Sequence, residues 1–66
     1  MTNEQRAEHA NRAIMVYEQT TQVEREDALK DLLASAMHWA DEQGQDFEEA
    51  LRVARMHYES EVLEEQ

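Results

Sequence analysis

The chain has 66 residues, no cysteine and no proline, and its sixteen acidic residues outnumber six basic ones, which gives a net charge of −10. A chain of this length forms one domain at most and buries only about 60% of the surface that its unfolded form exposes. The charge argues against direct binding to nucleic acid or to an anionic membrane, because lysine and arginine supply that affinity.

The lack of cysteine excludes disulfides and thiolate metal sites and suits a reducing compartment. The longest apolar run extends from Ala13 to Tyr17, far short of the roughly 20 residues that a membrane-spanning helix needs. No signal peptide precedes the first predicted helix. We therefore expect a cytoplasmic protein.

The first helix is predicted over residues 3–19. Thr2 and Gln5 have the spacing of a capping box, in which the two side chains bond each other's backbone amides. Apolar residues then recur at helical spacing, namely Ala7, Ala10, Ile14 and Tyr17. Because the start of this stripe is alanine-rich, we expect the first turns to fray and to pack firmly only from about Ala10.

The second helix is predicted over residues 22–43, with a capping box formed by Thr21 and Glu24. Its apolar stripe is widened by Trp39 and consists of Leu29, Leu32, Leu33, Ala36, Met37 and Ala40. Gly44 is expected to end the helix, because glycine adopts the left-handed conformation without a Cβ clash.

The third helix is predicted over residues 47–63, with Asp46 as its N-cap. Its stripe consists of Phe47, Ala50, Leu51, Ala54, Tyr58 and Val62. The fold class is therefore all-α with three helices, the second and third forming an antiparallel hairpin around Gly44. In that register Ala40 faces Leu51, and Leu29 lies near Val62.

A homodimer is expected because so small a core gives marginal stability. Val53, Met56 and Leu63 form a second, weaker apolar edge on the third helix, which a homodimeric bundle would bury. The connection between the first two helices has only one to three residues, which leaves the placement of the first helix open.

About half of the chain, residues 31–61, contains one characteristic pattern. Its residues are Asp31, Leu32, Leu33, His38, Trp39, Asp41, Gly44, Asp46, Phe47, Ala50, Leu51, Ala54, His57, Tyr58 and Glu61. This pattern resembles a family of small uncharacterised proteins of bacterial phages, plasmids and other mobile elements. Ser35 and Ala36 depart from it, since the family more often has an acid and a leucine there. The resemblance implies a compact helical protein of a mobile element and assigns no catalytic residues.

Two histidines have acidic neighbours at helical spacing, and such pairs can hold a divalent metal. His38 precedes Asp41 and Glu42 within one turn, and His57 precedes Glu61 by four residues. In so acidic a chain, exposed histidines among solvated acids are the more common arrangement, so we assign no metal, cofactor or catalytic residue. The alternative function is a metal-dependent helical hydrolase assembled across an oligomer, with ligands drawn from Glu24, Asp27, Asp31, His38, Asp41, His57 and Glu61.

The leading hypothesis is a non-enzymatic, acidic, helical interaction module that binds a basic protein surface. One version is an inhibitor of a host nucleic-acid-binding defence protein, in which carboxylates stand in for phosphates. Aromatic residues such as Trp39 and Tyr58 are more often core than binding hot spots. The candidate interaction residues are His38, Trp39, Asp41, Glu42, Glu48, Glu49, His57, Tyr58 and Glu61.

Overall fold

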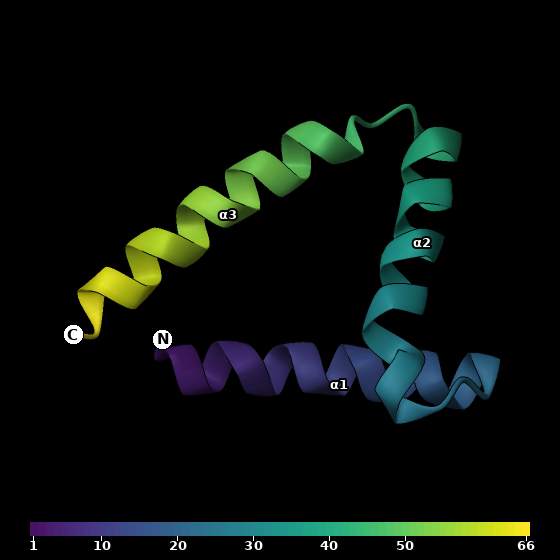
Figure 1. Ribbon diagram of the computed structural model, residues 1–66, viewed down its shortest axis with the longest axis horizontal. Coiled ribbons are helices and arrows are strands. Elements are labelled where there is room, and N and C mark those ends of the chain that lie inside the picture. Colours follow the sequence, from purple (N-terminus) through teal and green to yellow (C-terminus); the bar gives the residue numbers. More distant parts are fainter.

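Three α-helices and no strands make up the computed structural model, which describes all 66 residues. The helices are α1 (Asn3–Thr21), α2 (Arg25–Gln43) and α3 (Phe47–Glu64), and they are joined by short connections (Figure 1). The predicted all-α fold with three helices is confirmed. Compared with the expected ranges, α1 extends two residues further and α2 begins three residues later.

The helix caps explain where α1 and α3 begin. Thr2 and Gln5 form the predicted capping box, with bonds of 2.8 and 3.1 Å between each side chain and the other residue's backbone amide. Asp46 caps α3 by accepting a bond from the Glu49 amide at 3.0 Å. Both starts therefore follow from short-range chemistry that is visible in the sequence.

The start of α2 differs from the predicted one. The Thr21 hydroxyl donates to the Tyr17 carbonyl at 2.8 Å, so Thr21 belongs to the last turn of α1 and does not cap α2. Gln22 then adopts a left-handed conformation with φ 63°, and Glu24 becomes the N-cap without a side-chain bond. The expected capping box of Thr21 and Glu24 was wrong because a threonine at a helix end can bond backward as well as forward.

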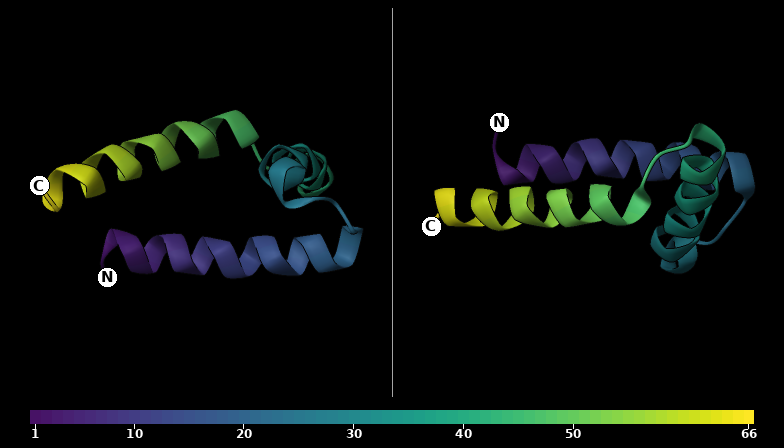
Figure 2. Two further views of the ribbon diagram at one scale, coloured as in Figure 1. Left: turned by 60° about the horizontal axis from the view of Figure 1, so that its bottom comes forward. Right: turned by 90° about the horizontal axis from the view of Figure 1, so that it is seen from above.

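Gly44 ends α2 in the predicted left-handed conformation, with φ 68°. The Gln45 amide donates to the Ala40 carbonyl at 2.9 Å across this turn, as in a Schellman cap. Helices α2 and α3 pack together next to the turn and then diverge, so that the three helices form the sides of an open triangle (Figure 1). In further views α3 runs back toward the start of α1, and the two termini lie at the same end (Figure 2).

The end of α3 lies beside the start of α1 rather than beside the start of α2 (Figure 1). Val62 and Tyr58 line a pocket together with Asn3, Arg6 and Ala7 of α1. The expected proximity of Leu29 and Val62 was therefore wrong, because the angle at the Gly44 turn carries α3 away from α2. The helical stripes do not encode that angle.

Very little of the chain is buried. Ala28 and Ala40 are the two buried residues, at 1% and 4% exposure, and no large apolar side chain is fully enclosed. The radius of gyration is 13.5 Å, compared with roughly 11 Å for a compact domain of this length. The aromatic side chains of Trp39 and Tyr58 are 54% and 66% exposed, so neither forms a core within the single chain.

Candidate functional site

The corner between α1 and α2 is held by a shared hydroxyl group. The Tyr17 hydroxyl donates to an Asp31 carboxylate oxygen at 2.5 Å and lies 2.6 Å from the Ser35 hydroxyl. The bond to Asp31 raises the pKa of Tyr17 above its ordinary value. Arg25 adds a 2.8 Å ion pair with Glu18. These contacts fix the placement of α1, which the sequence left open.

The start of α1 and the end of α3 meet through polar groups. The Asn3 backbone amide donates to the Glu65 carboxylate at 3.0 Å, and the Asn3 side chain donates to the Glu61 carbonyl at 3.0 Å. Arg6 forms a 3.2 Å ion pair with the Glu61 carboxylate. The start of α1 is thus tied to α3, a contact that the alanine-rich stripe does not predict, because its polar residues find partners far away in the sequence.

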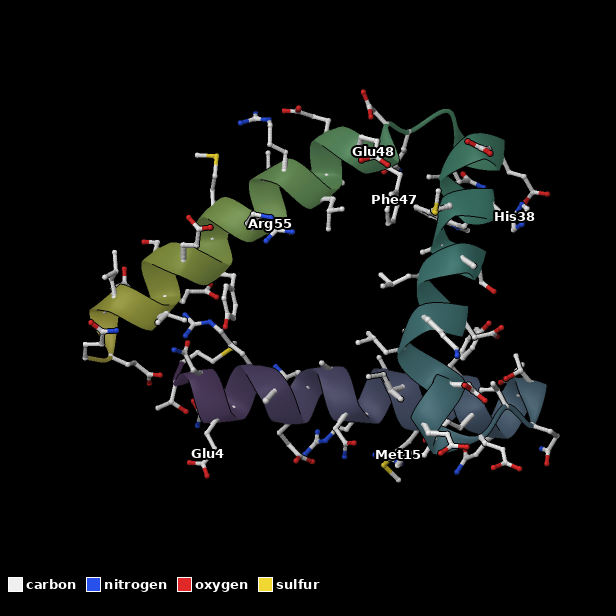
Figure 3. The ribbon with its side chains drawn as sticks, in the orientation of Figure 1. Glu4, Met15, His38, Phe47, Glu48 and Arg55 are labelled. Carbon is white, nitrogen blue, oxygen red and sulfur yellow. The ribbon has the colours of Figure 1, made fainter.

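Two adjoining hollows lie along the face of α3 that is turned toward the other helices. The first, which we call the α3 groove, has a volume of about 240 Å³ and is lined by Leu51, Ala54, Arg55 and Tyr58. The second, the terminal pocket, has a volume of about 410 Å³ and is lined by Asn3, Arg6, Ala7, Tyr58, Glu61 and Val62. Tyr58 lines both, and we call the two together the hollow. Figure 3 shows side chains of all three helices projecting into the triangle.

The candidate residues around the Gly44 turn form an exposed acidic corner. Asp41 and Glu42 end α2, while Glu48 and Glu49 occupy the first turn of α3, and all four are exposed. Glu49 accepts two bonds from the Arg52 guanidinium, at 2.6 and 2.9 Å, which hold the pKa of Glu49 below its ordinary value. The other three carboxylates have no ion pair. We call Asp41, Glu42 and Glu48 the acidic corner.

The remaining candidates do not join one site. His38 projects from the side of α2 that is turned away from the triangle (Figure 3), and His57 is exposed on α3. Tyr58 and Glu61 lie together in the terminal pocket. No group of three or more histidine, aspartate or glutamate side chains is placed to hold a metal ion within the chain.

Charge is distributed unevenly between the outside and the hollow. Five of the sixteen acids form ion pairs, with Arg6, Arg12, Arg25, Lys30 and Arg52, and the other eleven do not. Arg55 has no acidic partner in the chain although it lines the α3 groove. Sequence reasoning missed Arg55 because it follows the apolar stripe rather than belonging to it. The available signal was its position next to Ala54 at the edge of that stripe.

No protein-family model, curated protein or solved structure matches this chain. Within the structure, none of the three helices combines the length and the apolar character needed to cross a bilayer.

Proposed function

We propose that the chain is a non-enzymatic, homo-oligomeric interaction module of a phage or other mobile element, and that it binds a basic protein surface in the cytoplasm. The observation that carries the proposal is the exposed acidic corner, whose three carboxylates belong to the eleven that form no ion pair. Such a surface attracts cationic partners over a distance set by the ionic strength. The mobile-element origin rests on the resemblance over residues 31–61.

The partner class follows from charge and shape. Carboxylates arranged along helices resemble a row of phosphates to a protein that recognises nucleic acid through lysine and arginine. A host nucleic-acid-binding defence protein is therefore the proposed target. Binding should weaken as salt increases, because the attraction acts between exposed charges.

The test uses the immobilised chain and the bacterial proteins that a heparin column retains, since that fraction is enriched in basic nucleic-acid-binding proteins. We expect captured proteins to be released both by added salt and by competing duplex DNA. A variant with Asp41→Asn, Glu42→Gln and Glu48→Gln should lose most of the capture. A matched control with Glu4→Gln, Glu24→Gln and Glu59→Gln has the same charge change away from the corner.

Two results would contradict the proposal. The first is capture that neither salt nor duplex DNA reverses, which would indicate an apolar contact. The second is an equal loss of binding in the acidic-corner variant and in the control, which would assign the effect to net charge alone rather than to this surface.

A further inference from the structure

The single chain exposes more surface than a compact protein of its mass. Its accessible surface is 5646 Å² at 7.8 kDa, whereas a compact monomer of that mass exposes roughly 4,400 Å². The difference of about 1,200 Å² exceeds the roughly 800 Å² that each partner buries in a standard stable interface. The chain therefore has enough uncovered surface for a dimer interface.

Part of the uncovered apolar surface lines the hollow. Leu51 is 41% exposed and Tyr58 is 66% exposed, although both belong to the main apolar stripe of α3. On α2, Leu29, Leu33 and Met37 also remain exposed. A helix buries its apolar stripe against another element in a stable fold. In this chain no element fully covers the stripe of α3.

The charges in the hollow fit an acidic occupant. Arg6 and Glu61 neutralise each other across the terminal pocket, and Arg55 is the charged residue of the α3 groove, without an ion pair in the chain. A basic partner would meet this uncompensated cation, while a second copy, with eleven carboxylates that form no ion pair, would bring a partner for it. Glu61 is the acid that lines the hollow, and it is paired with Arg6, so repulsion between two copies comes from carboxylates around the contact and is weakened by salt.

We propose that a second copy of this chain covers the α3 groove, packing apolar side chains against Leu51, Ala54 and Tyr58 and placing a carboxylate beside Arg55. This rests on the homo-oligomer of the proposed function and names the surface that forms it. The interface is isologous, so each substitution in the groove acts twice in the dimer.

The test is sedimentation equilibrium of the full chain and three variants. Leu51→Glu should raise the dimer dissociation constant about 100-fold, because each of the two copies then places a charge in the apolar contact. Arg55→Ala should raise the same constant about threefold through the lost charge pair. Met56→Glu is the matched control and tests the other dimer surface, the second apolar edge expected from the sequence: Met56 is 56% exposed, and helical spacing places it on the far side of α3 from the groove. This variant should change the dimer dissociation constant by less than a factor of two.

Circular dichroism shows whether Leu51→Glu keeps its helices, and a second measurement does not depend on that variant. The chain has no cysteine, so Ala54→Cys and Met56→Cys each carry a single spin label. The label at residue 54 should become immobile on dimerisation, while the label at residue 56 stays mobile. The reverse labelling pattern would overturn the proposed surface.

The outcomes separate this inference from the proposed function. A dimer that survives Leu51→Glu and dissociates with Met56→Glu would overturn the groove and leave the homo-oligomer standing. A wild-type chain that stays monomeric at millimolar concentration would overturn both the groove and the homo-oligomer. Binding of basic proteins at the acidic corner is measured independently with the acidic-corner variant, which should remain dimeric.

Discussion

Helix α1 meets α2 at its C-terminal half and α3 at its start, and the two contacts differ in kind. At the α2 contact, Tyr17 shares its hydroxyl with Asp31 and Ser35, and the nearby start of α2 contains Ala28, which is 1% exposed. At the α3 contact, partly exposed polar groups of Asn3 and Arg6 meet Glu61 and Glu65. Close packing accompanies only the first.

This difference assigns separate roles to the two parts of the chain. Burial of apolar surface supplies most of the stability of a fold, whereas exposed ion pairs supply little. The α1–α2 pair is therefore the better-anchored unit, and α3 is held by the Gly44 turn and by polar bonds. A helix that exposes part of its apolar stripe and is weakly anchored in its own chain is well suited to packing against a second chain.

The largest predicted effect concerns the closely packed contact between α1 and α2. Ala28→Leu should lower the free energy of unfolding by about 1–3 kcal/mol, because an almost fully enclosed methyl group leaves no space for three more carbons. Ala34→Leu is the control, since Ala34 is exposed on the same helix. Urea unfolding followed by circular dichroism measures both. Equal stability of the two variants would show that the α1–α2 corner is not tightly packed.

The next largest effect concerns the two connections between helices, because each contains a residue with a left-handed backbone conformation. Gly44→Ala should lower stability by about 1 kcal/mol through backbone strain alone, because no atom lies within 4 Å of the added Cβ. Gln22→Gly should raise stability by about 0.5 kcal/mol, because Gln22 already has φ 63° and glycine relieves that strain. Thermal unfolding tests the opposite signs. A loss of stability with Gln22→Gly would indicate that the Gln22 side chain contributes more than its backbone strain costs.

Tyr17→Phe should lower the melting temperature by a few degrees by removing the hydroxyl that joins α1 to α2. Because the pKa of Tyr17 is raised in the folded state, its contribution is present below the unfolded pKa of about 10 and is lost as pH rises through the folded value. The wild type should therefore lose stability above about pH 10 more steeply than the variant. Melting curves from pH 7 to 11 measure this, and parallel curves would contradict it.

The elements that the sequence predicted depend on residues close together in the chain. The Thr2 and Asp46 caps, the Gly44 turn and the three apolar stripes all follow from spacings of a few residues. The triangle does not, because the angle at Gly44 and the bonds of Asn3 and Arg6 to the far end of α3 join distant parts of the sequence. Arg55 became a site residue only when the groove beside it was known.

The smallest predicted effect concerns the polar contact between α1 and α3. Glu61→Gln removes the ion pair with Arg6, whose side chains are about one-third exposed, and should lower the free energy of unfolding by no more than about 0.5 kcal/mol. The Asn3 bond to the Glu61 backbone carbonyl is unaffected. Glu8→Gln, which removes the looser 3.8 Å pair with Arg12, is the control and should have less effect still. Hydrogen exchange at the first amides of α1 reports the contact directly. If Glu61→Gln lowered stability as much as Tyr17→Phe, the two ends of α1 would be equally anchored. Helix α3 would then not be the weakly held helix that is free to pack against a partner.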